Sequence, residues 1–196
     1  MPLSDNKLFA QAGGVTAIDR AAVLGQEPLT IWLTGLSASG KSTLAYALEK
    51  SLIDEEKACF VLDGDNVRQG LNKDLGFSDV ERSENIRRIA EVAKLMNEAG
   101  LIVITAFISP FAADRSLAKS IIGADRFLEV YLSTPLDVCE RRDTKGLYEQ
   151  ARSGNLLDFT GISQIYEVPS SPDLKIDTTF MELVEILAIV RKRFAL

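Results

Sequence analysis

The sequence predicts an α/β fold with a parallel five-stranded sheet and helices on both faces of that sheet, in three layers. Two observations predict it: short, mostly apolar segments rich in β-branched residues, and segments with helical spacing that alternate with them. The expected strands are Thr30–Thr34, Cys59–Leu62, Leu101–Phe107, Phe127–Leu132 and a weaker Leu174–Ile176. A chain of 196 residues, of which 46% are hydrophobic, has room for one such core and little for a second.

Apolar residues that recur every three or four positions mark the helices between these strands. They include Leu44, Leu48 and Leu52, and further along Ile86, Ile89, Ala93 and Met96. Gly100 is expected to end the second of these helices. Capping-box spacing in Ser78–Glu81 and in Thr179–Glu182 predicts helices that begin just after Ser78 and just after Thr179.

Residues 1–28 are predicted to form an irregular N-terminal arm before the domain at 29–196, because Gly13, Gly14, Gly25 and Pro28 interrupt them. Cys59 and Cys139 do not form a Cys-x-x-Cys pair, so each is expected to be a buried structural residue. The chain lacks a basic start followed by an apolar run, and no apolar stretch approaches the length of a membrane span. We therefore expect a cytoplasmic protein.

Charge and composition exclude several classes of function. The 22 Lys and Arg against 28 Asp and Glu give a net charge of −6, so no overall field favours nucleic acid or anionic lipid. Neither a nucleic acid nor a membrane is expected as a partner, and any phosphate site is expected to be local. The sequence has no histidine, which excludes Ser-His triads and His-containing metal sites. Carboxylates or lysines are left for acid–base work.

A phosphate-binding motif follows the first expected strand. Residues 35–42 fit G-x-x-x-x-G-K-[ST] in full and stand between a strand and a helix, as the motif requires. Its glycines let backbone N–H groups face phosphate oxygens, Lys41 reaches the β- and γ-phosphates, and the Ser42 hydroxyl is typical of a Mg²⁺ ligand. The alternative is a Gly/Ser-rich turn that matches by chance. The expected ATP-binding residues are Gly35, Leu36, Ser37, Ala38, Ser39, Gly40, Lys41, Ser42 and Thr43.

The motif predicts the fold of the P-loop nucleoside triphosphate hydrolases but not the reaction, because motors, switches and kinases share it. A GTPase would carry Asn-Lys-x-Asp after a later strand, whereas the strand ending near Thr134 leads into Pro135-Leu136-Asp137. A kinase of small molecules fits the sequence better.

Residues that could serve a second substrate follow the second strand. Asp63 could orient Mg²⁺ or accept a hydroxyl proton, and Asp65 stands two residues further on; an acidic turn is the alternative. Arg82 and Asn85 share one helix face and could hold an anionic, base-bearing substrate, although each of these residues taken alone is more often found on a surface. Phe77 could be a core residue or a stacking platform.

Basic residues concentrate between Arg141 and Arg152 in this otherwise acidic chain, and residues 141–162 are predicted to form a lid over phosphates. With this stretch included, the motifs resemble, in their order, the adenylylsulfate kinase family from about Val15 to Pro172. The matching segments are Gly35–Thr43, Asp63–Asn72, Leu75–Ser78, Glu84–Lys94, Phe107–Pro110, Asp114-Arg115, Cys139–Gly146 and Phe159–Ile162. In the arm, Ala10-Gln11 departs from the Trp-His pair of many bacterial relatives.

The resemblance implies transfer of the γ-phosphate of ATP to the 3′-hydroxyl of adenosine 5′-phosphosulfate, which gives 3′-phosphoadenosine 5′-phosphosulfate and ADP. It implies Mg²⁺ held by Ser42 and Asp63, with Lys41, Asp63 and Ser109 as catalytic residues. It also implies a homodimer, and functional coupling to an ATP sulfurylase. The residues implied to bind adenylylsulfate are Asp65, Asn66, Arg68, Phe77, Arg82, Asn85, Ile108, Ser109, Lys145 and Phe159, with Phe77 and Phe159 stacked on the adenine.

Two questions stay open from the sequence. Ser109 matches a serine described as a phosphorylated intermediate in bacterial members, but a serine with no histidine nearby is a weak nucleophile, and direct transfer with Ser109 as a substrate contact is the alternative. The chain could also be a kinase of another hydroxyl compound, such as gluconate or a nucleoside, or a non-catalytic nucleotide-binding module.

Overall fold

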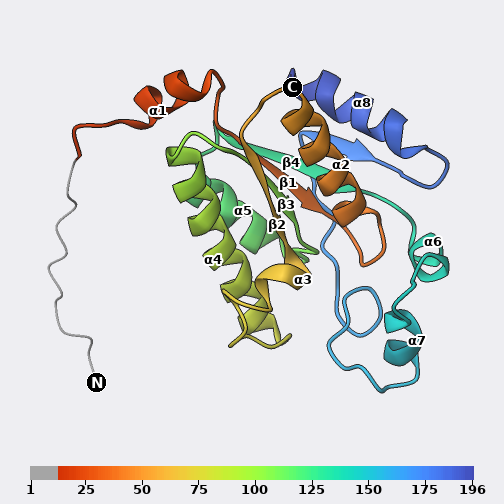
Figure 1. Cartoon of the computed structure of the whole chain (residues 1–196). Helices are drawn as coiled ribbons and strands as arrows, with labels where there is room; N and C mark the ends of the chain where they lie inside the picture. Colours follow the sequence, from red (N-terminus) through yellow and green to blue (C-terminus); the bar gives the residue numbers. More distant parts are fainter. Residues whose placement is uncertain (1–12) are drawn as a thin grey trace, which may run out of the picture.

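The computed structural model describes residues 13–196, so residues 1–12 of the predicted arm, including Ala10 and Gln11, lie outside the described part (Figure 1). The helices are α1 (Ala17–Leu24), α2 (Lys41–Asp54), α3 (Gly64–Val67), α4 (Asp79–Glu98), α5 (Ala112–Ile122), α6 (Leu136–Arg141), α7 (Leu147–Arg152) and α8 (Leu183–Phe194). The strands are β1 (Thr30–Thr34), β2 (Cys59–Asp63), β3 (Ile102–Ala106), β4 (Phe127–Leu132) and β5 (Leu174–Ile176).

The five strands form one parallel sheet in the order β2-β3-β1-β4-β5, which confirms the predicted fold class. β1 is central: Ile31 lies opposite Ile104 of β3 on one side and Leu128 of β4 on the other. The predicted bounds of β1, β4 and β5 are confirmed, β2 extends one residue further than expected, and β3 is one residue shorter at each end.

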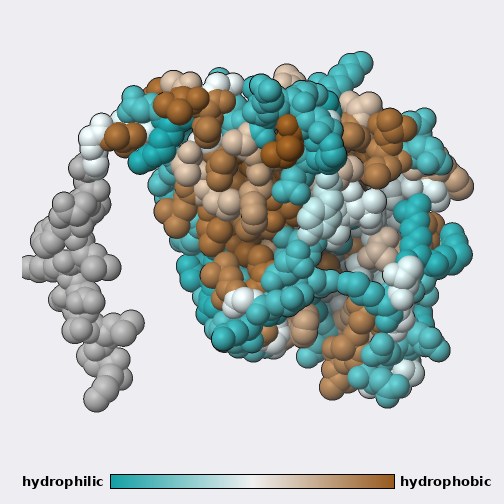
Figure 2. All heavy atoms as spheres, in the orientation of Figure 1, coloured by the Kyte–Doolittle hydropathy of each residue, from teal (hydrophilic) through white to brown (hydrophobic). Residues whose placement is uncertain are grey.

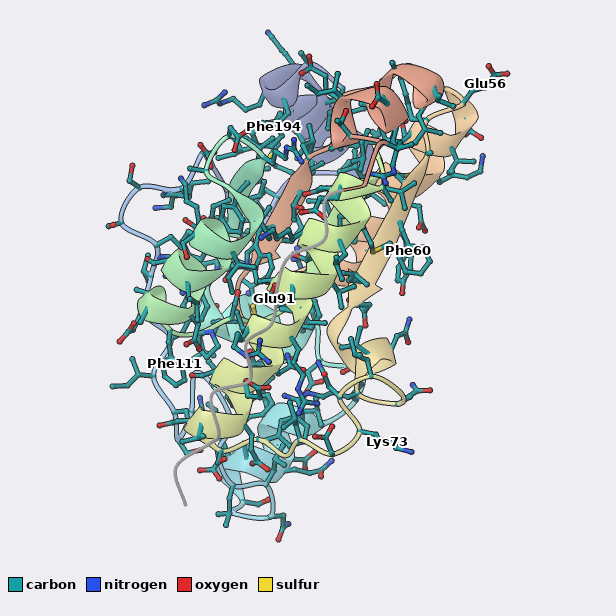
Figure 3. All side chains as sticks on the ribbon, turned by 90° about the vertical axis from the view of Figure 1, so that its left-hand side faces the viewer. Glu56, Phe60, Lys73, Glu91, Phe111 and Phe194 are labelled. Atoms are coloured by element: carbon teal, nitrogen blue, oxygen red, sulfur yellow. The ribbon has the colours of Figure 1, made fainter. Side chains whose placement is uncertain are left out.

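Helices cover both faces of the sheet, α2 and α8 on one and α4 and α5 on the other (Figure 1). Figure 3 shows α4 and α5 side by side on the second face. Successive strand residues point to opposite faces, so Ile31 and Leu33 pack with α2 and α8, whereas Trp32 packs with α4 and α5. All of β1 is buried, which explains its continuous apolar sequence.

The expectation of an irregular arm is wrong for α1. Thr16 and Asp19 form a capping box, in which the Asp19 amide donates to Thr16 Oγ1 at 3.2 Å and the Thr16 amide donates to Asp19 Oδ2 at 2.7 Å. Gly25 ends the helix with φ of +60°. The buried amide of Gln26 then joins the arm to the domain, because its Nε2 donates to the carbonyls of Ala58 and Gly100, both at 2.8 Å.

The expected helix start after Thr179 is also wrong, since α8 begins at Leu183. The Thr179 amide donates instead to Asp177 Oδ1 at 2.9 Å, which forms a local turn. The capping box lies three residues later: Glu182 precedes the helix, and its amide donates to Glu185 Oε2 at 2.9 Å. The other expected start is confirmed, because Ser78 and Glu81 cap α4 reciprocally.

Both cysteines are free thiols. Cys139 is buried as expected, but Cys59, on the edge strand β2, is only partly buried.

Within residues 13–196 no helix combines the length and the hydropathy needed to cross a bilayer.

Candidate active site

One pocket of about 940 Å³ lies at the carboxyl ends of the strands, where parallel α/β sheets bind ligands. This volume is at the upper end of the range for ligand sites. Most of the site residues expected from the sequence line it, namely Ser37, Ala38, Gly40, Lys41, Ser42, Thr43, Asp63, Asp65, Arg68, Phe77, Arg82, Asn85, Ile108, Ser109, Lys145 and Phe159. The fold thus brings together segments that are far apart in the chain.

The phosphate loop has the backbone that its glycines predict. Gly35 has φ of +148°, and a Cβ there would lie 2.7 Å from the Leu132 carbonyl oxygen, so only glycine fits. Gly40 precedes α2 with φ of +98°. The amino end of this 14-residue helix therefore faces the pocket, and backbone N–H groups there favour anions.

Lys41 is buried, and its ammonium folds over its own loop. Nζ donates to the carbonyl oxygens of Gly35 at 2.9 Å and Leu36 at 2.6 Å. Burial lowers the pKa of Lys41 to about 8, although nearby Cys139, Asp63 and Asp65 act in the opposite direction. The buried ammonium lacks the stabilisation that water would give it. A phosphate in place of these carbonyls would supply a negative charge that stabilises it.

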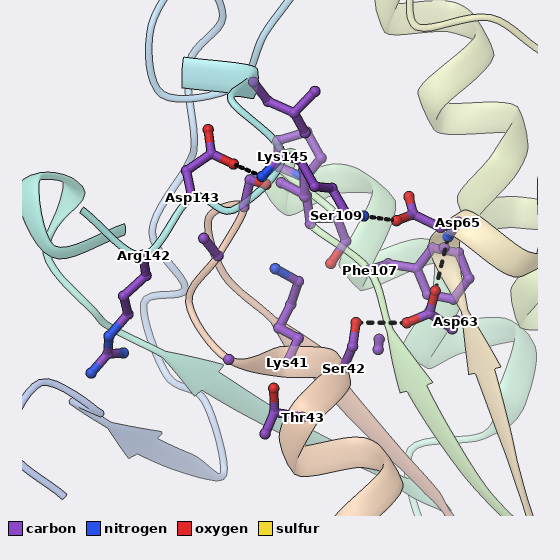
Figure 4. A pocket seen from close by; sticks show the side chains of 18 of the residues that line it. Lys41, Ser42, Thr43, Asp63, Asp65, Phe107, Ser109, Arg142, Asp143 and Lys145 are labelled. Carbon is purple, nitrogen blue, oxygen red and sulfur yellow. Dashed lines mark hydrogen bonds and ion pairs between the residues drawn. The ribbon is translucent and has the colours of Figure 1, made fainter. Parts of the chain in front are cut away.

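A chain of polar contacts joins the phosphate loop to the far side of the pocket (Figure 4). Ser42 Oγ donates to Asp63 Oδ2 at 2.7 Å, and Asp63 Oδ1 accepts from the Asp65 amide at 3.0 Å. Asp65 forms an ion pair with Lys145, which comes from the predicted lid. Ser42 and Asp63, 21 residues apart in the sequence, thus present two hard oxygen donors side by side.

Two arginines flank Phe77 on the other side of the pocket. The guanidinium carbon of Arg68 lies 4.5 Å from the centre of the Phe77 ring, and that of Arg82 lies 5.4 Å away. Burial lowers the pKa of Arg82, and the neighbouring Arg68 adds to this effect. Among the described residues neither guanidinium forms an ion pair with a carboxylate. Two adjacent cations that form no direct ion pair favour an anionic ligand.

Asn85 presents an amide to the same space. It is 4% exposed and lines the pocket, and its Oδ1 accepts from Asn72 Nδ2 at 2.9 Å. The shared helix face of Arg82 and Asn85 is therefore confirmed, and the surface alternative is wrong for both, because they are buried.

The lid segment packs on the phosphate loop. Tyr148 Oη donates to the Ser37 carbonyl at 3.0 Å, and its ring meets the Phe159 ring edge-on at 4.9 Å between centres. These two residues form a small core with Cys139 and Ala151. Arg82 Nη2 donates to the Asp158 carbonyl at 2.6 Å, so the lid contacts both ends of the pocket.

Four expected site residues do not line the pocket: Gly35, Leu36, Ser39 and Asn66. The first three still shape the phosphate loop through their backbone. The Asn66 amide is turned away and donates to Tyr46 Oη at 2.9 Å.

Arg142 and Thr178 also line the pocket; sequence reasoning included Arg142 only as part of the predicted lid and missed Thr178. Arg142 Nη1 donates to Thr178 Oγ1 at 2.8 Å, and Thr178 Oγ1 approaches the Ser39 carbonyl at 3.2 Å. Thr178 follows the carboxyl end of β5, so the rule that drew attention to Asp63 and Ser109 would have found it if applied to the weaker fifth strand.

A parallel sheet with a phosphate loop after its central strand, a buried loop lysine and a hydroxyl–carboxylate pair beside it define a P-loop nucleotide-binding protein. The model of the family described as Adenylylsulphate kinase matches residues 27–177 of the chain. The chain belongs to the adenylylsulphate kinase family.

Individual relatives agree with this. The chain is 58% identical over 159 residues to an adenylyl-sulfate kinase of Pseudomonas aeruginosa, covering 81% of each protein. The Mycobacterium tuberculosis APS kinase, solved in complex with AMPPNP and APS, is 44% identical with a TM-score of 0.83, over 87% of this chain and 99% of that one. A hexameric APS kinase from Thiobacillus denitrificans is 31% identical with a TM-score of 0.66, over 86% of this chain and 29% of that one.

Proposed function

We propose that the protein is an adenylylsulfate kinase, which transfers the γ-phosphate of ATP to the 3′-hydroxyl of adenosine 5′-phosphosulfate. One observation carries the proposal: the pocket is lined by a phosphate loop and also by Phe77, whose ring lies near two arginines that form no direct ion pair. Such a pocket suits a ligand that carries both an aromatic base and an anion. The named relatives support the same assignment.

Loop residues 35–43 would hold the phosphates of ATP, and Lys41 would stabilise the charge on the phosphoryl group during transfer. Asp63 would orient the acceptor hydroxyl and the metal.

Mg²⁺ fits the neighbouring hydroxyl and carboxylate of Ser42 and Asp63, because it prefers oxygen ligands and takes its other ligands from phosphates and water. When bound, it would neutralise phosphate charge. Within residues 13–196 no cluster of three or more His, Cys, Asp or Glu side chains could hold a metal alone.

The acceptor would lie between the two aromatic rings. We assign its adenine to Phe77 and Phe159, and its anionic group to Arg68 and Arg82. The remaining proposed contacts are Asp65, Asn66, Asn85, Ile108, Ser109 and Lys145, of which Asn66 would have to turn from Tyr46 to reach the pocket. Ser109 is proposed as a contact of the acceptor in a direct, in-line transfer.

A coupled assay for ADP release with Mg-ATP tests the function. Adenylylsulfate is compared with AMP, gluconate, a nucleoside and no acceptor. Turnover only with adenylylsulfate is expected, because the other acceptors lack either the base or the sulfated anion. Turnover with gluconate or a nucleoside would keep the fold and replace the substrate. Bound nucleotide without turnover on any acceptor would indicate a non-catalytic module.

Phe77→Ala is expected to raise KM for adenylylsulfate roughly tenfold and to leave KM for ATP unchanged, because aromatic–base stacking contributes about 1–3 kcal/mol per base. Phe159→Ala is expected to act in the same direction but also to lower Tm, since Phe159 packs on Tyr148. Leu117→Ala is the matched control: Leu117 is 44% exposed, close to the 53% of Phe77, but it lies on α5 outside the pocket lining. Equal effects of Phe77→Ala on both substrates would contradict the stacking site.

ATP affinity is expected to fall as the pH rises through about 8. The pKa of Lys41 in the free protein is lowered to about 8 by burial, so Lys41 is charged below that pH and neutral above it. Phosphate binds the charged form, and Kd for ATP should therefore rise about tenfold from about pH 7 to about pH 9. Calorimetric titration across this range measures it. Lys41→Arg, which stays charged, should give a flat profile, and a flat profile in the unsubstituted protein would contradict the assignment.

We further propose a homodimer. Apolar side chains gather on the surface over α4 and the β2 edge of the sheet, beneath α1 (Figure 2), and the exposed hydrophobic residues of these elements include Ile18, Phe60 and Leu95. Light scattering during size-exclusion chromatography would give the mass in solution. Coupling to an ATP sulfurylase and a cytoplasmic location stay predictions.

A further inference from the structure

Ser109 occupies an unusual position in the wall of the pocket. It is 2% exposed, and its φ of +39° lies in the left-handed region, which is costly for a residue with a side chain. Such backbone persists only where surrounding contacts hold it. Two buried side chains do so here, one from the central strand and one from α5.

The first is Trp32, in the middle of β1. The side chain is fully buried between the rings of Phe107 and Phe127, with ring centres 6.1 and 5.5 Å away. The indole N–H, which can only donate, donates to Ser109 Oγ at 3.2 Å. Trp32 thus links the core of the α4–α5 face to Ser109.

The second is Arg115 of α5, which is 4% exposed. Its Nη1 donates to the Ser109 carbonyl at 2.8 Å, and its Nε donates to Glu129 Oε1, also at 2.8 Å. The carbonyl and the hydroxyl of Ser109 are therefore each held from a different element. The backbone of Ser109 is fixed by Arg115, and the side-chain oxygen is fixed by Trp32.

The hydroxyl hydrogen of Ser109 has a direction but no protein partner. Because the indole N–H approaches Oγ, the hydroxyl hydrogen must point away from Trp32. Among residues 13–196 this hydroxyl donates no hydrogen bond, although Ser109 lines the pocket. A buried donor without an acceptor is costly, and an oxygen of a bound ligand would remove this cost.

We propose that Trp32 is a positioning residue for the acceptor substrate: its indole N–H holds the Ser109 hydroxyl so that the hydroxyl donates to an oxygen of the acceptor. The inference rests on the proposed function in that it takes adenylylsulfate as the acceptor. Trp32 itself touches no substrate. Its contribution reaches the acceptor only through Ser109, and this dependence makes the proposal testable.

Trp32→Phe keeps an aromatic ring in the core, but removes the N–H donor together with part of the indole ring, so a lower Tm is expected beside any change in KM. We expect KM for adenylylsulfate to rise about threefold to tenfold, the range for one hydrogen bond, with KM for ATP unchanged. Ser109→Ala should give a similar rise, and the double variant Trp32→Phe/Ser109→Ala should be no worse than Ser109→Ala alone. Phe127→Leu is the control, because it disturbs the same aromatic cluster and leaves the N–H in place. It should lower Tm without changing either KM.

Additive effects of Trp32→Phe and Ser109→Ala, or equal effects of Trp32→Phe on both KM values, would overturn the proposal, because either result indicates a structural role.

Should Trp32→Phe fail to fold, nuclear magnetic resonance on the unsubstituted protein tests the same contact. Trp32 is the only tryptophan in the sequence, so its indole ¹H–¹⁵N signal is assigned without ambiguity. Ser109→Ala should shift that signal, and adenylylsulfate added without ATP should move it only where Ser109 is present. An indole signal whose chemical shift does not change in Ser109→Ala would also overturn the proposal. If the unsubstituted protein turns over another acceptor, the proposed function fails, but the Trp32–Ser109 contact is still tested by this signal.

Discussion

Replacing Lys41 with methionine should lower kcat at saturating substrates by about 10³-fold, the loss typical when one preorganised donor to a transition-state charge is removed. Lys41 is the first residue of α2 and lies behind the loop that curls around the phosphates. Its ammonium is buried and held by the carbonyls of Gly35 and Leu36. The ammonium is therefore present in the site, and on nucleotide binding it would exchange these carbonyls for phosphate oxygens. Methionine keeps the length and the apolar stem but has no charge.

The matched control is Lys50→Met, because Lys50 lies on the same helix, is largely exposed and pairs only with Asp54 in the described structure. Its kcat should stay within about twofold of the unsubstituted value, because exposed ion pairs contribute about 0–1 kcal/mol. Single-turnover kinetics under saturating ATP separate chemistry from binding. A loss confined to KM for ATP in Lys41→Met would mean that Lys41 contributes equally to ground state and transition state.

Asp63→Asn is expected to lower turnover by roughly 10²-fold or more while nucleotide binding largely persists. Asparagine has the same shape, and its Oδ1 can still accept from the Asp65 amide or from Ser42. What it loses is the negative charge, which both a hydroxyl proton and a metal cation require. The phosphate loop, which supplies the backbone contacts to the nucleotide, is not altered.

Calorimetry with ATP and an ADP-release assay with adenylylsulfate measure the two quantities separately. Asp54→Asn, at the exposed end of α2, is the control for the loss of one negative charge, and it should change neither. Near-normal turnover in Asp63→Asn would remove Asp63 from the mechanism. Turnover of that variant at a range of Mg²⁺ concentrations adds a further readout, because the loss of a metal ligand should raise the Mg²⁺ concentration needed for half-maximal rate.

Several parts of the fold were predictable because local sequence carries the physical cause. The apolar run at Thr30–Thr34 predicts a strand buried on both faces, and the structure has that strand at the centre of the sheet. The following phosphate loop is equally local, since the glycines at 35 and 40 permit its backbone and Lys41 is contiguous with them. Ser78 and Glu81 cap α4 as expected.

Other features could not be predicted because they depend on competition between nearby sequences or on distant partners. Thr179 and Glu182 have the spacing of a capping box, but Asp177 offers the Thr179 amide a closer acceptor and α8 starts later. The helix signal in the arm is atypical, because Thr16 and Asp19 cap α1 with an aspartate in place of the usual glutamate or glutamine.

The amino-acid sequence alone thus determined where the strands lie along the chain and where the phosphate loop follows the first of them. These features are local, because strand burial and loop conformation follow from neighbouring residues. Only the tertiary structure decided which side chains meet. Trp32 and Ser109 are 77 positions apart, and Arg142 and Thr178 are 36 apart. Their contacts arise because parallel strands bring their carboxyl ends to one edge of the sheet, where hydrogen bonding selects partners that no local pattern in the chain records.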